Sequence, residues 1–409
     1  MVFSLQRFRL EKPTAPFELG GICDRVNGVC TLSDAIGSVE LQGEQKQLQP
    51  LNPGDLVAVR VTVTDEFSVY CDKVIRHHKG AGSGSPVLKP HVPRFAAFVQ
   101  RVRDFFMERG LHELITPTLV KCPGLEPTLE PFSTEVVMGK HRVTAYLPTS
   151  PEISLKKAMA LGWTDIFEIK NCFRKGEFTT VHDNEFLMLE WYRAFDNLML
   201  IEQDLLALFN ILGEEGWIQE GKLKVDETDF AALFQTLFDF HLTPRTTTDE
   251  LRTLCEDLSI HNIEDDTFND LFHRIMIDRV EPFLSQKGPT LVRAFPPSMA
   301  ALAKLDPHGW TDRFEFYWRG FEIANAFNEV TDPDEQMNRW RHEIRERKRL
   351  GTSPLPHDSG LIEALKKGIP PSGGIALGLE RLYMACAGVE EIRELRLFGP
   401  RDLFPVAST

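Results

Sequence analysis

Apolar and polar residues alternate in short runs over the N-terminal segment 1–80 of the chain. These runs cover residues 17–19, 28–32, 38–41 and 56–63, and Asn52-Pro53-Gly54-Asp55 supplies a turn just before the last of them. A period of two is typical of strands that bury one face, and Asn, Pro and Gly favour the turns between strands. The pattern therefore predicts about five short strands, which in so short a segment favour a small barrel.

The composition changes at residues 79–93, KGAGSGSPVLKPHVP, where Gly, Ser and Pro are frequent and apolar residues show no period. Such a composition is typical of a connection between domains. We therefore predict three parts: an OB-like (oligonucleotide/oligosaccharide-binding) β-barrel over residues 1–80, a linker over 81–93 and a larger α+β domain over 94–409.

Two helices stand out in the larger part. Apolar residues recur at spacings of three and four from Phe95 to Phe106, and Gly110 provides a stop, so a helix is predicted there. Residues 334–350, DEQMNRWRHEIRERKRL, predict a second, highly charged helix with a solvated face.

Strand-like runs occupy residues 166–169, 186–192 and 313–318. In the last run the side chains divide between two faces, Phe314, Phe316 and Trp318 on one and Glu315, Tyr317 and Arg319 on the other. Strands with charge on one face, in so large a domain, predict an antiparallel sheet that is flanked by helices and presents a polar, functional surface.

Composition and charge narrow the class of protein. Of 409 residues, 46 are Lys or Arg and 60 are Asp or Glu, which gives a net charge of −14, and 42% are hydrophobic. These values are ordinary for a globular protein, and no apolar run approaches the ~20 residues of a membrane span. The seven Cys show no metal-ligand spacing and the N-terminus no signal pattern, so we expect reduced thiols in the cytoplasm and no membrane partner.

No GxxxxGK[ST] loop is present, so an ATP-binding protein of this sequence would hold the phosphates in another way. Arg174 precedes a predicted hairpin and could bind a phosphate or a carboxylate with two nitrogens, while Phe186 could stack on a base. Glu315 and Glu322 flank a bend at Gly320, and their oxygens suit Mg²⁺ carried by nucleotide phosphates. Alone, these residues would fit an interstrand ion pair and a solvated strand edge equally well.

A third segment, GGIALGLERL at residues 373–382, is a strand of small residues that leads into a helix. Gly378 would let a ligand approach the backbone, and Arg381 in the first helical turn favours a terminal phosphate. This segment alone would also fit close packing of a strand against a helix. The order of the three segments along the chain is more informative than any one of them.

That order resembles the three signature motifs of class II aminoacyl-tRNA synthetases, most closely those of the lysyl branch. The matching strings are TSPE at 149–152, FR and H-x-x-EF-x-MLEWY within 173–192, RFE and EIAN-x-F-x-E within 313–329, and G-x-ALG-x-ER at 374–381. The resemblance spans residues 92–405. Within the branch, the strings MLEWYR, FPPSMAALA, IEALKKGIPPSGG and GIALGLERL are most similar to the ligases that modify elongation factor P. Ala324 and Ala376 stand where lysyl-tRNA synthetases usually carry Gly.

The resemblance implies that lysine or (R)-β-lysine is activated with ATP and Mg²⁺ as an aminoacyl-adenylate and passed to a lysine of elongation factor P, by a homodimer. It implies catalytic roles for Arg174 and Arg381. The ATP-binding residues that it implies are Arg174, His182, Asp183, Phe186, Glu322, Ile323, Gly378 and Arg381. The amino-acid pocket that it implies consists of Ser150, Glu152, Glu190, Tyr192, Asn325 and Glu329, with Glu329 and Tyr192 at the distal ammonium. Glu315 and Glu322 would bind the metal.

The sequence departs from the family pattern around the second motif. Lys175-Gly176 follow Arg174 where Asn-Glu is usual, Thr180 or Val181 replaces an Arg, and Asp183-Asn184 replace Asn-Pro. The N-terminal barrel is also unusual for the elongation factor P ligases.

Three alternatives stay open. A compact lysyl-tRNA synthetase is favoured by the barrel but disfavoured by the nine basic and ten acidic residues of segment 1–80, because an RNA-binding domain is usually basic. A noncatalytic regulatory paralogue is favoured by the altered second motif. A ligase that passes another basic amino acid to a small molecule is the third.

Overall fold

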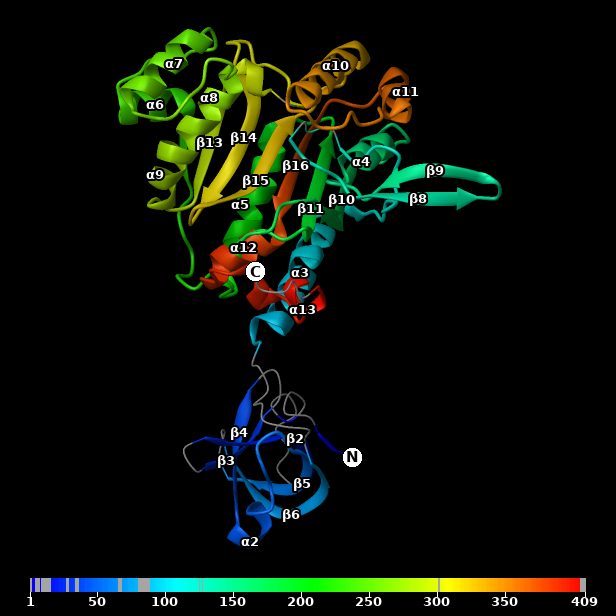
Figure 1. Cartoon of the computed structure of the whole chain (residues 1–409), viewed down its shortest axis with the longest axis vertical. Coiled ribbons are helices and arrows are strands. Elements are labelled where there is room, and N and C mark those ends of the chain that lie inside the picture. Colours follow the sequence, from blue (N-terminus) through cyan, green and yellow to red (C-terminus); the bar gives the residue numbers. More distant parts are fainter. Residues whose placement is uncertain are drawn as a thin grey trace. The chain divides into compact units, whose positions relative to one another are not determined.

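The structure is a computed structural model that describes residues 2–3, 8, 16–26, 29–33, 37–64, 68–79, 89–124, 126, 128–300 and 302–404. Backbone contacts divide the chain into two compact units (Figure 1). The first consists of Met1–Ala97 with Arg393–Thr409, and the second of Phe98–Ile392. The C-terminal segment thus clusters with the N-terminal unit, whereas the sequence suggested that it belongs to the larger domain. Most of the predicted linker, 81–88, lies outside the described residues.

The first unit is built on a sheet of short strands. Its strands among the described residues are β1 (Val2–Phe3), β2 (Phe17–Val26), β3 (Val29–Ser33), β4 (Ser38–Gly43), β5 (Leu56–Val63) and β6 (Ser68–His78), with a short helix α2 (Gln45–Leu48) after β4. β2 pairs with both β3 and β5, β3 with β4, and β4 with β6, which pairs with β5. Each predicted run therefore overlaps a strand. The pairings form a continuous series that begins at β2, passes through β3, β4, β6 and β5, and ends again at β2.

The second unit contains one large sheet and a separate hairpin of β8 (Ser133–Met138) and β9 (His141–Tyr146). The strand order of the large sheet is β12-β13-β14-β15-β16-β11-β10-β7. The bounds are β7 (His112–Glu113), β10 (Asp165–Phe173), β11 (Glu185–Ala194), β12 (Asp226–Asp229), β13 (Thr290–Phe295), β14 (Thr311–Trp318), β15 (Phe321–Asn328) and β16 (Ser372–Gly378). The six inner strands are antiparallel, as predicted, but β12 and β7 pair parallel to their neighbours. The sheet is therefore mixed, which corrects the expectation of a purely antiparallel one.

Helices surround this sheet (Figure 1). The helices of the second unit are α4 (Glu152–Met159), α5 (Leu198–Glu214), α6 (Phe230–Phe238), α7 (Thr248–Asp257), α8 (Phe268–Ile275), α9 (Glu281–Ser285), α10 (Pro333–Arg349), α11 (Ser359–Lys367) and α12 (Leu379–Ala387), with a π turn η1 (Met276–Val280) and a 3₁₀ turn η2 (Pro297–Met299). The helix α3 (His91–Glu108) and the 3₁₀ turn η3 (Ile392–Leu395) cross the division between the units, and α13 (Pro400–Leu403) belongs to the first. Both helices predicted from periodicity are confirmed, as α3 and α10. α3 begins at His91, so the last three residues of the predicted linker are helical.

The two faces of the large sheet differ as the alternation in β14 predicts. Phe316 and Trp318 meet the ring of Phe209 on α5 edge-on, with centroids 5.6 and 5.2 Å apart. α5 and α12 pack on β11, β15 and β16, so this face belongs to the core. Glu315 and Tyr317 point to the opposite side of β14. One face is thus covered by helices and the other carries the polar side chains.

A tight turn joins β14 to β15 at the predicted bend. Arg319 and Gly320 both have positive φ, 53° and 78°, a backbone conformation that suits the twist of a two-residue hairpin and that Gly adopts without strain. The turn pairs Tyr317 with Glu322, and a one-residue register shift between Phe316 and Tyr317 then places Glu315 opposite Asn325.

A buried ion cluster ties α3 and β11 to α5. Asp204 has no exposed surface, and its carboxylate accepts hydrogen bonds from Arg109 Nε at 2.8 Å and from Arg193 Nε at 2.8 Å. Asp204→Ala would leave the Arg193 guanidinium buried without its main counter-charge. We expect a loss of about 3–5 kcal/mol in the free energy of unfolding, measured by urea denaturation.

The control for this prediction is Glu215→Ala at the end of α5. Glu215 pairs with Arg101 at 2.8 Å near the surface, where an ion pair contributes only about 0–1 kcal/mol. Equal losses for the two variants would contradict the role assigned to Asp204.

Candidate active site

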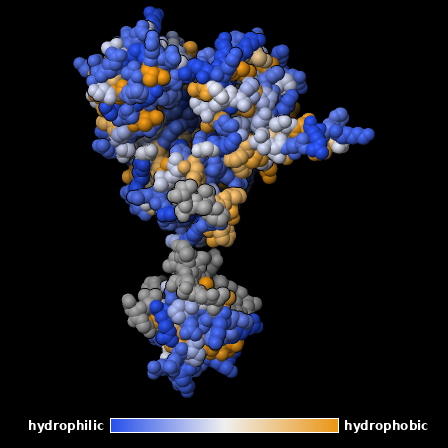
Figure 2. All heavy atoms as spheres, viewed as in Figure 1, coloured by the Kyte–Doolittle hydropathy of each residue, from blue (hydrophilic) through white to orange (hydrophobic). Residues whose placement is uncertain are grey.

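A cavity of about 900 Å³ opens on the polar face of the large sheet. In the space-filling view, mainly hydrophilic side chains surround a hollow between α6–α8 and α10 (Figure 2). The cavity is lined by twelve of the residues that the sequence singled out: Ser150, Glu152, Arg174, His182, Asp183, Phe186, Glu190, Glu322, Ile323, Asn325, Gly378 and Arg381. Tyr192, Glu315 and Glu329 are buried near lining residues but do not line the cavity themselves.

A row of residues crosses the floor of the cavity from strand to strand. Glu190 on β11 lies opposite Ala376 on β16, which lies opposite Asn325 on β15, which lies opposite Glu315 on β14. Residues opposite one another in a sheet point to the same face. The backbone register therefore brings together side chains that are far apart in the sequence.

Arg174 and Phe186 form one end of the cavity. The Arg174 guanidinium carbon lies 5.1 Å from the centroid of the Phe186 ring, and its Nη1 lies 3.8 Å from Glu177. Arg174 Nε is buried and finds no hydrogen-bond partner within the described part of the chain. A buried guanidinium nitrogen without an acceptor is costly, so this arrangement suits an anionic ligand.

Arg381 lies beside the hairpin loop of the second motif. It donates to the backbone oxygen of Glu322 at 2.9 Å and contacts Nε2 of His182. Burial, and next the charge of Arg381, lower the pKa of His182, so the ring is neutral at pH 7. Gly378 precedes α12, and nothing lies closer than 3.8 Å to the position of a Cβ there. The start of α12 is thus open to the cavity.

Two acids that line the cavity, Glu152 and Glu190, form a cluster with the buried Glu329 around an internal lysine, Lys156. Lys156 Nζ lies 2.5 Å from Glu152 Oε1 and 2.6 Å from Glu329 Oε2. Glu190 accepts a hydrogen bond from the Tyr192 hydroxyl at 3.0 Å. Burial raises the pKa of Glu329 to about 7, although Lys156 counteracts the shift, and burial with the charge of Glu152 raises the pKa of Glu190 well above its usual value.

Gly374 makes room for two of these side chains. A Cβ at this position would lie 2.3 Å from Glu329 Oε1 and 2.4 Å from Cε1 of Tyr192. Only glycine therefore lets the Glu329 carboxylate and the Tyr192 ring pack over β16.

Glu315 and Glu322 form a second acidic pair. Glu315 accepts hydrogen bonds from the Tyr317 hydroxyl at 2.5 Å and from Asn325 Nδ2 at 3.2 Å, and it contacts Arg313. Burial, and next the charge of Glu322, raise the pKa of Glu315 to about 7. Among the described residues, no three metal-ligating side chains converge. Mg²⁺ commonly uses one or two carboxylates together with substrate phosphates, and this pair fits that donor set.

Two features of the cavity were missed from the sequence. Lys156 follows Glu152 by four residues on α4, a spacing that could have indicated the ion pair. The other is the rim, where Asp270 on α8 pairs with Arg349 on α10 at 3.1 Å.

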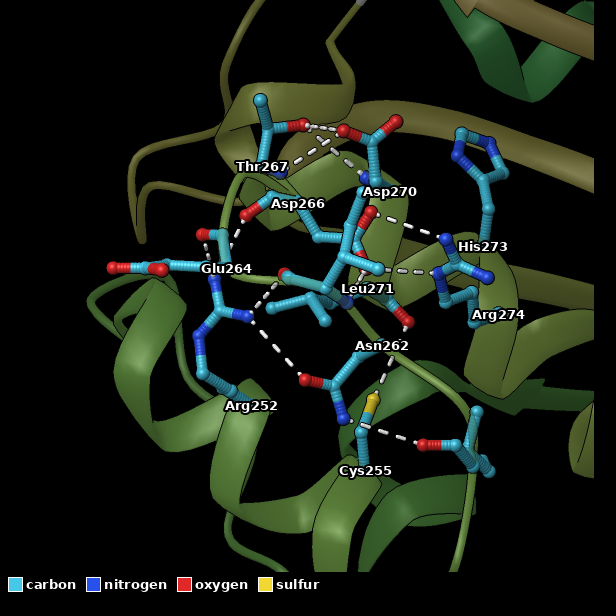
Figure 3. Close-up of polar contacts among 12 residues, drawn as sticks. Arg252, Cys255, Asn262, Glu264, Asp266, Thr267, Asp270, Leu271, His273 and Arg274 are labelled. Carbon is cyan, nitrogen blue, oxygen red and sulfur yellow. Dashed lines mark hydrogen bonds and ion pairs between the residues drawn. The ribbon is translucent and has the colours of Figure 1, made fainter.

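The start of α8 is held in place by a polar network (Figure 3). Arg252 on α7 donates to the backbone oxygens of Ile263 at 2.6 Å, Glu264 at 3.0 Å and Asp266 at 3.0 Å. Thr267 and Asp270 form a capping box at the first turn. This network fixes the loop before α8, and with it one side of the rim.

Comparison with known proteins identifies the class. Residues 91–402 match the family of class II tRNA synthetases (D, K and N), and the chain belongs to this family. The N-terminal sheet lies outside the matched residues.

Several relatives carry the same more specific name. The chain is 35% identical to the elongation factor P–(R)-β-lysine ligase of Mannheimia succiniciproducens over 311 residues, which are 74% of this chain and 93% of the relative. It is 32% identical to the ligases of the same name from Enterobacter sp. over 316 residues (76% and 94%) and from Salmonella arizonae over 321 residues (76% and 94%). The chain is thus similar to these ligases over nearly their whole length. Within the described residues, no helix is long and apolar enough to cross a membrane.

The raised pKa of Glu329 gives a testable pH dependence. Its carboxyl is neutral well below pH 7 and ionised above, and only the ionised form attracts an ammonium group. We therefore expect the KM for lysine to fall by about tenfold as the pH rises from 6 to 8. Steady-state ATP–pyrophosphate exchange measures this value, and a lysine KM that is constant over this range would contradict the assignment.

Proposed function

We propose that the protein activates lysine or (R)-β-lysine with ATP as an aminoacyl-adenylate and transfers the acyl group to a lysine of elongation factor P. The single observation that carries the choice of amino acid is the buried acidic cluster of the cavity. It contains Glu152, Glu190 and Glu329 around one ammonium, Lys156, and two further acids, Glu126 and Glu343, line the same cavity. The acids therefore outnumber the internal cation, and a diamino acid would supply two ammonium groups that favour the ionised carboxylates.

The floor of the pocket supports the choice of isomer. The methyl group of Ala376 lies between Glu190 and Asn325 in the row across the sheet, and Ala324 lies on the neighbouring strand. Both residues line the cavity. The methyl group of Ala376 narrows the space beside the backbone atoms of an amino acid, whereas Ala324 lies opposite Phe316 on β14, so its methyl group points to the core face. A β-amino acid places its amino group one carbon further from the carboxylate, and we propose that this geometry suits the narrowed floor.

The reaction needs no protein nucleophile. An oxygen of the amino-acid carboxylate attacks the α-phosphorus of ATP, and pyrophosphate leaves. We assign the stabilisation of the developing charge to Arg174 and Arg381, which line the cavity, and adenine binding to Phe186. The acceptor amine then attacks the carbonyl carbon, and AMP leaves. Glu322 and Glu315 would hold Mg²⁺, which neutralises phosphate charge when it is bound.

We further propose that the protein acts in the cytoplasm as a homodimer. Ile115 is 94% exposed, and Leu119, Leu161 and Trp163 are also exposed on the same unit. Large apolar side chains at the surface favour a protein contact. We expect light scattering to give a molar mass near twice 46.5 kDa, and Ile115→Glu to yield the monomer. A wild-type monomer would contradict this proposal.

A second candidate function is the charging of tRNA. The strand pairings of the N-terminal unit return to β2, and we propose that this unit is an OB-like barrel, a fold that commonly binds nucleic acid. The unit lies outside the family match, and segment 1–80 is not basic. These observations disfavour tRNA as the acceptor.

The experiment separates activation from transfer. ATP–pyrophosphate exchange is measured with α-lysine, (R)-β-lysine and ornithine, and elongation factor P and tRNA are then offered as acceptors with labelled amino acid. Exchange with a lysine isomer and labelling of the protein would support the proposal. Exchange with none of the three would contradict the enzymatic function, and stable labelling of tRNA alone would identify the second candidate.

A further inference from the structure

Lys156 is a buried lysine inside the acidic cluster, and the role inferred for it rests on the function proposed above. The side chain of Lys156 is 3% exposed, and its Nζ lies between Glu152 and Glu329. Lys157, the next residue, is different: its side chain is 35% exposed and pairs with Asp358 at the surface of α4. The two lysines have the same side-chain chemistry but different surroundings, so Lys157 serves as a control for Lys156.

A buried carboxylate without a counter-charge takes up a proton rather than stay ionised. Lys156 supplies the counter-charge for Glu329 Oε2, while Glu329 Oε1 lies over Gly374. The contact therefore favours the ionised carboxylate and sets the direction of its other oxygen. A substrate ammonium needs both, because its acceptor must be ionised and must point into the pocket.

We propose that Lys156 is a positioning and specificity residue: it orients the Glu329 carboxylate and favours its ionised form as the acceptor of a substrate ammonium. Without this lysine, the Glu329 carboxyl would hold a proton in place of an ammonium. The enzyme would then lose its preference for a diamino acid over a neutral analogue of the same shape. Norleucine, which lacks the distal amino group of lysine, is such an analogue.

The ionisable groups that face Lys156 come from several elements. Glu152 lies on the same helix, Glu329 follows β15, and Glu190 and Tyr192 lie on β11. Lys304 also lowers the pKa of Glu329, and less than Lys156 does. Although burial alone would lower the pKa of Lys156, Glu152 and Glu329 raise it, so the lysine stays charged at every pH of the assay.

The test compares Lys156→Met with the control Lys157→Met by ATP–pyrophosphate exchange. We expect Lys156→Met to raise the KM for lysine at least about tenfold at pH 7, with the KM for ATP changed less than about threefold. The lysine KM should recover in part at pH 9, and the ratio of norleucine to lysine affinities should rise. Lys157→Met should leave all these values unchanged. Equal effects of the two substitutions, or equal losses toward lysine and ATP, would overturn the proposal.

A rescue experiment tests the proposal even if Lys156→Met folds poorly. Lys156→Ala removes three carbons and the amino group, which propylammonium can replace. We expect propylammonium to restore lysine-dependent exchange in a saturable manner, and propan-1-ol to have no such effect. Equal rescue by both compounds, or by neither, would overturn the proposal. Absence of exchange in the wild-type protein would instead contradict the proposed function itself and this inference with it.

Discussion

Glu329→Gln is expected to lower kcat/KM for lysine in ATP–pyrophosphate exchange at least about 100-fold, because it removes one partner of a buried charge pair. The glutamine keeps the shape of the side chain but cannot balance the charge of Lys156 or attract the substrate ammonium. Most of the loss should appear in the KM for lysine, and the KM for ATP should change little. The measurement is steady-state exchange with each substrate varied in turn.

Glu227→Gln is the matched control. Glu227 is an exposed partner of Arg293 on the same unit, outside the cavity, so activity should stay within twofold of the wild type. If Glu329→Gln were as active as this control, the distal ammonium could not lie at Glu329.

Gly374→Ala is expected to abolish lysine-dependent exchange while the protein stays folded. The added methyl group would lie more than about 1 Å inside the normal contact distance to Glu329 Oε1 and to the Tyr192 ring, so both side chains must leave their places. We expect a loss of about 100-fold or more in kcat/KM for lysine and a cost of about 1–3 kcal/mol in stability.

The neighbouring Gly373 gives a control on the opposite face of the same strand. A Cβ there would lie 2.6 Å from the Ile201 side chain and 2.8 Å from the backbone oxygen of Asn197, at the start of α5. Gly373→Ala should therefore lower the melting temperature but leave the lysine KM of the folded enzyme nearly unchanged. A Gly374→Ala variant that loses only stability would show that lysine binding does not depend on the positions of Glu329 and Tyr192.

Periodicity was sufficient to predict the elements whose patterns are strong. α3, β10, β11 and β14 could be predicted because one face of each is apolar and the other polar. The parallel edge strands could not, because β7 and β12 are very short and are fixed by pairing with distant segments.

The sequence was sufficient to predict which residues line the cavity, but not which side chains contact one another there. Twelve of the proposed residues line the cavity because their motifs lie on the inner strands and adjoining loops. The partner of Glu329 could not be predicted, since Lys156 is distant along the chain and reads locally as part of an ordinary amphipathic helix. The orientation of Glu315 could not be predicted either, because its oxygens accept hydrogen bonds from Tyr317 and Asn325 within the sheet.

The row Glu190–Ala376–Asn325–Glu315 exists only when four strands have paired in their correct register. The last of these strands, β16, is made of residues 372–378, so a chain that is still being synthesised cannot bind the amino acid before this late segment has been added. A shift of one residue in any pairing would turn the row to the core face. Binding of lysine therefore reports on completed folding of the whole second unit, and a bound ligand should protect amides across the entire sheet from hydrogen exchange.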